Sequence, residues 1–68
     1  MEQFNERLKQ LRLGKGLSQK ELASLVGLTT SAIGNYEIGI REPSIEVIKS
    51  LCRFFDVSSD YLLGLSDV

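Results

Sequence analysis

Residues 29–37 carry polar side chains whose types and spacing suit hydrogen bonding rather than catalysis. Thr30, Ser31 and Asn35 would share one face of a helix, because residues four apart meet on the same side. An asparagine amide can pair bidentately with adenine, hydroxyls can donate or accept, and a threonine methyl can pack on a thymine methyl. Taken alone, these residues have the composition of an ordinary solvated polar face, and contact with base edges is expected only if the helix projects from the domain.

Catalytic and metal chemistry lack the residues that they need. The 68 residues include no histidine and a single cysteine, Cys52, which excludes the usual zinc sites and the common nucleophile–base pairs. The sequence has no close carboxylate pair and is too short for a pocket, so we expect no enzyme, no cofactor and no small-molecule substrate. One cysteine favours a reducing, cytoplasmic setting, and we expect Cys52 to pack in the core.

The charge is distributed unevenly along the chain. The net charge is −1, whereas a generic nucleic-acid coat would be basic. Residues 1–20 carry five basic and two acidic residues, and residues 42–68 carry two basic and five acidic ones. We expect a solvated basic face of which one or two members contact phosphate: Arg7, Lys9, Lys15 and Lys20. No apolar run approaches the roughly 20 residues of a membrane span, and no signal peptide or basic amphipathic helix is evident.

The apolar spacing predicts a single all-helical domain over residues 1–68, with its core within about 4–64. Phe4, Leu8 and Leu11 follow the i, i+4, i+7 pattern and predict a helix over 3–14. A second helix follows the capping box Ser18–Glu21, a third covers about 29–38, a fourth ends near Phe55, and a short fifth precedes residue 64. Four residues are suited to capping the later helices: Ser18, Thr29, Ser44 and Ser58.

The turn between the second and third helices, residues 26–29, is the most informative feature. A steep angle between helices needs a small residue where they cross, and Ala23 supplies it. It also needs a residue that tolerates positive φ, and Gly27 supplies that. Five apolar residues can fill the angle from both sides: Leu22, Val26, Leu28, Ile33 and Tyr36. This geometry would project the third helix outward, where a major groove can admit it.

The stretch from Gln19 to Glu37 resembles the helix-turn-helix of the Cro and lambda-repressor family, also called XRE-family regulators. The resemblance continues through residues 17–19, 39–44 and 57–64, so that it covers about residues 4–64. It implies an all-α, compact five-helix lambda-repressor-like fold, with the helix-turn-helix in helices 2 and 3. It also implies sequence-specific binding to a double-stranded DNA operator.

The resemblance assigns roles to individual residues. Thr30, Ser31 and Asn35 match positions that reach base edges. Four residues match positions that contact the DNA backbone: Gln19, Thr29, Ile40 and Arg41. At Gln19 the backbone N–H and the helix dipole would point at the same phosphate. Arg12 and Glu37 match a pair that forms a salt bridge between helices 1 and 3 in many members.

The expected recognition helix departs from the family in two ways. It contains no arginine or lysine, and Gly34 lies in its middle, at a cost of about 1 kcal/mol relative to alanine. Gly34 either lets the backbone approach DNA closely or is simply tolerated. These departures favour a half-site with A·T pairs, modest affinity and some reliance on DNA shape.

The apolar residues near the C-terminus exceed what five short helices can bury. We expect four of them to form a small dimer patch: Phe54, Tyr61, Leu63 and Leu65. Two such domains would bind half-sites about 34–36 Å apart.

The function that the sequence favours is transcriptional regulation, as a homodimeric repressor of bacterial or phage origin. The alternative is a protein-interaction module on the same fold, an anti-repressor or antitoxin-like adaptor, which the acidic pI of about 5.3 and the uncharged helix favour. The sequence leaves open whether the chain is a complete small regulator or part of a longer repressor.

Overall fold

The structure is a computed structural model that describes residues 2–68. Five helices follow one another along the chain: α1 (Glu2–Gly14), α2 (Gln19–Val26), α3 (Thr30–Ile38), α4 (Ile45–Phe55) and α5 (Ser59–Leu62). The described residues contain no strand, so the predicted all-helical class with five helices is confirmed. The third helix begins at Thr30, directly after the cap expected at Thr29.

Side-chain caps set the starts of four helices. Ser18, Thr29, Ser44 and Ser58 each have extended backbone angles and accept a hydrogen bond from the N–H three residues later. Such caps satisfy N–H groups that have no partner inside the helix. The capping residues named from the sequence are thus confirmed at all four positions.

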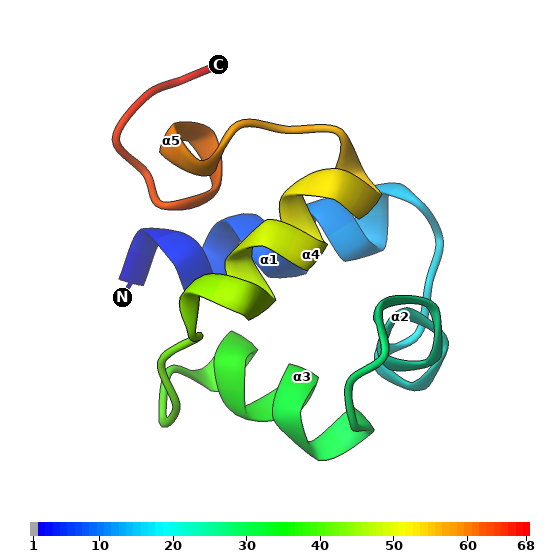
Figure 1. Ribbon diagram of the computed structural model, residues 1–68. Coiled ribbons are helices and arrows are strands. Elements are labelled where there is room, and N and C mark those ends of the chain that lie inside the picture. Colours follow the sequence, from blue (N-terminus) through cyan, green and yellow to red (C-terminus); the bar gives the residue numbers. More distant parts are fainter. Residues whose placement is uncertain (1) are drawn as a thin grey trace.

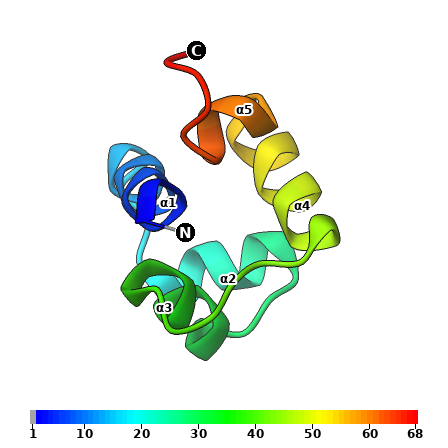
Figure 2. The same ribbon diagram turned by 90° about the vertical axis from the view of Figure 1, so that its left-hand side faces the viewer.

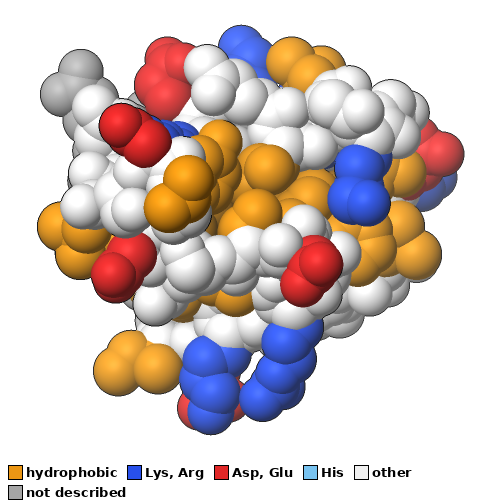
Figure 3. All heavy atoms as spheres, turned by 90° about the horizontal axis from the view of Figure 1, so that it is seen from above, with side chains coloured by type: hydrophobic (Ala, Val, Ile, Leu, Met, Phe, Trp, Pro, Cys, Tyr) orange, Lys and Arg blue, Asp and Glu red, His pale blue; other side chains and the backbone are white. Residues whose placement is uncertain are grey.

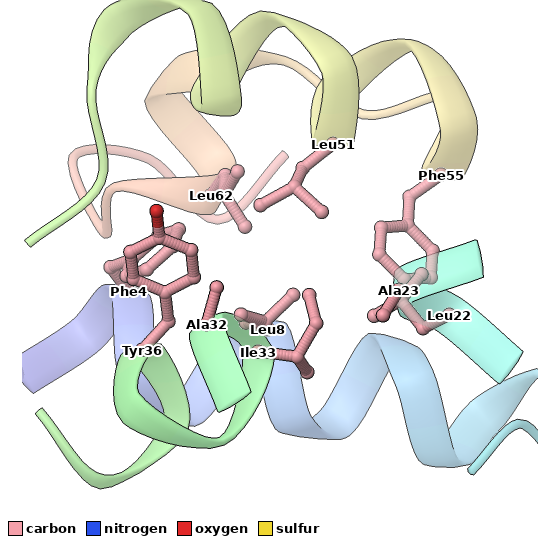
Figure 4. Packing of buried hydrophobic residues seen from close by; sticks show 10 residues of the cluster. All are labelled: Phe4, Leu8, Leu22, Ala23, Ala32, Ile33, Tyr36, Leu51, Phe55 and Leu62. Carbon is pink, nitrogen blue, oxygen red and sulfur yellow. The ribbon is translucent and has the colours of Figure 1, made fainter. Parts of the chain in front are cut away.

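The core draws side chains from every helix, as Figure 4 shows. Phe4 of α1 meets Tyr36 of α3 edge to face, with ring centroids 6.1 Å apart. Cys52 lies half-buried against this core, and burial raises the pKa of its thiol, as suits a packing residue. Ten residues form the buried cluster: Phe4, Leu8, Leu22, Ala23, Ala32, Ile33, Tyr36, Leu51, Phe55 and Leu62.

The helices divide the molecule into two ends. α2 and α3 lie together at one end, and α5 with the C-terminal tail lies at the other, in both views of the ribbon (Figures 1 and 2). α1 and α4 run between them. Within the described residues no helix is both long and apolar enough to cross a membrane.

Candidate nucleic-acid interface

The turn between α2 and α3 sets these helices at a steep angle. Figure 1 shows α2 nearly end-on while α3 lies across the view. Gly27 takes the left-handed conformation at φ 73°, and the N–H groups of Gly27 and Leu28 both donate to the Ala23 carbonyl. A residue with a Cβ would be strained at this φ. Ala23 itself is buried in the core.

One face of α3 is buried in the core, and the opposite face carries polar groups that can bind a partner. Ala32, Ile33 and Tyr36 fill the inner face. Thr30 and Ser31 are exposed and Asn35 is half-buried, and none of these three side chains forms a hydrogen bond within residues 2–68. Their donors and acceptors are therefore free for an external partner such as a base edge.

The N-terminus of α2 opens beside α3. Its capping box is complete: Ser18 accepts from the N–H of Glu21, and the Glu21 carboxylate accepts from the N–H of Ser18 at 2.8 Å. That second hydrogen bond lowers the pKa of Glu21. Gln19, the first helical residue, has a backbone N–H without a partner among the described residues. This N–H and the helix dipole together favour an anion at this point.

Arg12 and Glu37 form the salt bridge expected between the first and third helices. Arg12 Nε donates to Glu37 Oε2 at 2.7 Å and Nη2 donates to Oε1 at 3.0 Å, with side chains 10% and 5% exposed. The remaining amino group donates to the Leu17 carbonyl at 2.8 Å. The hydrogen bonds to Glu37 raise the pKa of Arg12 above its ordinary value. One guanidinium therefore joins α1, the loop before α2, and α3.

Two surface hollows flank α3. One is lined by Gln19 and Glu37 together with Lys9, Arg12 and Ile38. The other brings Thr29 and Arg41 together, two residues that the sequence assigned to backbone contacts. The Arg41 guanidinium lies 5.5 Å from the centre of the Tyr36 ring. The polar face of α3 thus has candidate phosphate contacts on both sides.

Ile40 has no free backbone N–H with which to make the expected contact to the DNA backbone. Its backbone N–H already donates to the Asn35 carbonyl at 3.1 Å, and its side chain is 73% exposed. The N–H of Arg41 has no partner among the described residues, so Arg41 is better equipped to hold a phosphate.

The expected dimer patch is more buried than the sequence suggested and is divided between two places: Phe54 lines a hollow with Leu25 and Val26 of α2, whereas the other three residues lie in or directly after α5. Phe54 and Leu63 pack partly against the core, and Tyr61 is half-buried. Leu65 remains 75% exposed. Figure 3 shows apolar side chains gathered across the middle of the face above α5 and the tail.

Arg7 was wrongly expected on the solvated basic face. Its guanidinium donates to the carbonyls of Tyr61 (3.0 Å) and Ser66 (2.9 Å) and lies 4.2 Å from the centre of the Tyr61 ring. The expectation failed because Arg7 follows Phe4 by three residues, at the edge of the apolar stripe. An arginine stem there can lie along the core. The hydrogen bond between Gln19 and Glu37, also missed, had no sequence signal.

Comparison with known proteins identifies the same unit. A family model described as Helix-turn-helix matches residues 8–62. The chain is 43% identical over 60 residues to YonR, an uncharacterized HTH-type transcriptional regulator of SPbeta prophage origin in Bacillus subtilis (strain 168). That match covers 88% of this chain and 56% of YonR, so the chain spans little more than half of this relative.

Two solved structures share the fold. The restriction-modification controller protein C.AhdI from Aeromonas hydrophila superposes with a TM-score of 0.81 at 41% identity, covering 90% of this chain and 92% of that one. The DNA-binding domain of the P22 c2 repressor also gives 0.81, at 31% identity, covering 96% and 88%. The five-helix arrangement expected from the sequence is thus shared with a restriction-modification controller protein and a repressor DNA-binding domain.

Proposed function

Because this chain belongs to the helix-turn-helix family of the Cro and lambda-repressor type, a class of transcriptional regulators and not of enzymes, we propose that it binds a double-stranded DNA operator sequence-specifically. Residues 1–68 act as one DNA-binding domain, with α3 in the major groove. The observation that carries the proposal is the outer face of α3, whose polar groups have no internal partner while its inner face is fixed in the core.

Base edges are read by Thr30, Ser31 and Asn35. The Asn35 amide pairs with adenine, and each good bidentate pair contributes about 1–3 kcal/mol of discrimination. α3 has no arginine or lysine that could hydrogen-bond to a guanine, so the half-site is rich in A·T pairs.

Phosphates bind on both sides of this face. On one side Gln19 offers its backbone N–H and side-chain amide. On the other side Thr29 and Arg41 share a hollow. The Thr29 hydroxyl accepts from the Ala32 N–H at 3.0 Å and keeps its own proton to donate. Ile40, whose N–H is already used within the fold, contributes only its exposed apolar side chain at the edge of the contact.

Two copies bind together as a homodimer. The proposed interface comprises Tyr61, Leu63 and Leu65, in or directly after α5 at the end opposite to α3 (Figure 1), together with Phe54, which lies beside α2. Half-sites then lie about 34–36 Å apart on one face of the duplex. We infer repression rather than activation because the P22 c2 protein, whose domain shares the fold, is named a repressor.

A protein-interaction adaptor is the second candidate. The net charge of −1 and the absence of arginine and lysine from α3 favour it over a generic DNA binder. The salt dependence of binding separates the two, because each phosphate contact contributes about −0.9 to the slope of log K against log salt.

The test is selection of binding sites from a pool of random duplexes at two salt concentrations, followed by sequencing. We expect a two-fold symmetric motif that Asn35→Ala loses at one position and that Gln19→Ala weakens uniformly. Ser24→Ala, an exposed change elsewhere on α2, is the control. Absence of any enrichment at low salt would overturn DNA recognition and favour the adaptor.

A further inference from the structure

The Glu37 carboxylate serves more than the salt bridge. Its Oε1 atom accepts from Arg12 at 3.0 Å and also from the side-chain amide of Gln19, through Nε2 at 3.3 Å. Glu37 lies near the C-terminal end of α3, whereas Gln19 is the first residue of α2. One buried carboxylate therefore links the α2 N-terminus to α3.

The other side of the Gln19 amide lies against α3. A Cβ built on Gly34 would be 3.5 Å from Gln19 Oε1, which is an ordinary van der Waals contact. The amide is thus placed between a carboxylate and the backbone of the helix that faces the DNA. A glutamine side chain free in solvent samples many rotamers, and fixing it costs up to about 2 kcal/mol. Here the fold fixes it before any ligand arrives.

We propose that Glu37 is a positioning residue for the Gln19 side chain, which rests on the DNA binding proposed above. Glu37 takes one N–H of the amide and leaves the second to a phosphate at the N-terminus of α2. A carboxylate so near the DNA would repel phosphate, but Arg12 neutralises it through two hydrogen bonds. Arg12 and Glu37 therefore set the orientation of Gln19 without contacting the DNA themselves.

A merely structural salt bridge predicts something different. It would lower stability when broken, and it would affect DNA binding equally whether or not Gln19 is present. A positioning role instead couples Glu37 to Gln19 and to one phosphate. Double-mutant cycles measure such coupling directly.

The experiment measures operator affinity by fluorescence anisotropy for four chains: the unmodified protein, Glu37→Gln, Gln19→Ala and the double variant. Glu37→Gln leaves one neutral acceptor oxygen for which Arg12 and Gln19 must compete. We therefore expect it to weaken binding about fivefold in the unmodified background, and less than twofold when Gln19 is alanine. Replacing the one phosphate at the α2 N-terminus by a methylphosphonate should abolish the coupling. Additive effects in the cycle would overturn the positioning role.

A second variant and a spectroscopic measurement extend the test. If Glu37→Gln unfolds, Glu37→Asp keeps the charge for Arg12 but withdraws it from Gln19, and the same cycle applies. The side-chain amide signals of Gln19 in 15N spectra report its orientation without DNA and should shift in either variant. If the unmodified protein binds no duplex at low salt, the proposed function fails. If it binds without coupling, only the positioning role fails.

Discussion

Two arginines of α1 hold opposite ends of the molecule by different chemistry. Arg12 reaches α3 and meets a carboxylate, with both side chains nearly buried. Arg7 reaches α5 and the tail, where its two hydrogen bonds go to backbone carbonyls. The Asp67 carboxylate is 3.6 Å from the Arg7 guanidinium and fully exposed, so this ion pair contributes little.

This difference predicts how each end responds when one of its interacting groups is removed. Removing one member of a buried ion pair leaves a charge without water or partner, which is far more costly than the pair is stabilising. Carbonyls in a surface tail can turn to water when their donor is lost. Loss of one charged partner should therefore destabilise the α3 end strongly. Loss of one hydrogen bond should weaken the α5 end only in part.

Arg12→Ala gives the largest expected effect. It leaves the Glu37 carboxylate buried and uncompensated, so we expect a loss of about 3–5 kcal/mol in the free energy of unfolding. A domain of this size has little more than that in total. Urea unfolding followed by circular dichroism measures the change, with Lys9→Ala, exposed on the same helix, as the control. The double change Arg12→Met with Glu37→Leu should recover most of the loss, and failure to do so would contradict the unpaired-charge explanation.

Gly64→Ala tests whether the α5 end also has a rigid point. Gly64 has φ 79°, and a Cβ there would overlap Gln3 Cβ at the start of α1. Left-handed strain and this overlap together should lower the free energy of unfolding by about 2–3 kcal/mol. A shift in the thermal midpoint of only one or two degrees would show that the tail moves aside freely.

Arg7→Ala should loosen the C-terminal tail and leave α3 intact. Loss of two charge-assisted hydrogen bonds and the Tyr61 contact should cost about 1–2 kcal/mol. Hydrogen exchange should quicken at residues 63–68 and stay unchanged in α3. Equal loss of protection at both ends would mean that the two regions do not respond separately.

Gly34→Ala is the smallest expected change and has the opposite sign. The added Cβ meets Gln19 at an ordinary contact distance and φ is not positive, so alanine should stabilise α3 by up to about 1 kcal/mol. Chemical denaturation of this variant beside Gly64→Ala compares one substitution at both ends. Destabilisation would show that the Gln19 amide needs the space above Gly34.

Local signals explain why the helices could be predicted. Ser18, Thr29, Ser44 and Ser58 cap from their own side chains, and capping involves only the next few residues. The apolar pattern of the sequence predicted five of the ten buried core residues, as members of a helical apolar stripe or as residues that fill the α2–α3 angle: Phe4, Leu8, Leu22, Ile33 and Tyr36.

The candidate site also has one part that the sequence predicted and another that it did not. The polar face of α3 follows from helical spacing alone, because the inner residues fix which side turns outward. The pairing of Arg12 with Glu37 came from the family resemblance, since 25 positions separate them in sequence. The placement of Gln19 against Glu37 and Gly34 depends on how α2 packs against α3, so it is visible only in the tertiary structure.

By itself the sequence determined the helices, their caps, the steep turn at Gly27 and the polar outer face of α3. These depend on interactions within a few residues, which propensity and periodicity encode. Only the tertiary structure decided that Arg7 holds the tail, that Gln19 shares a carboxylate with Arg12, and that Phe54 and Leu63 pack partly against the core. Those outcomes depend on where whole helices pack against one another, and long polar side chains find their partners only after that packing is complete.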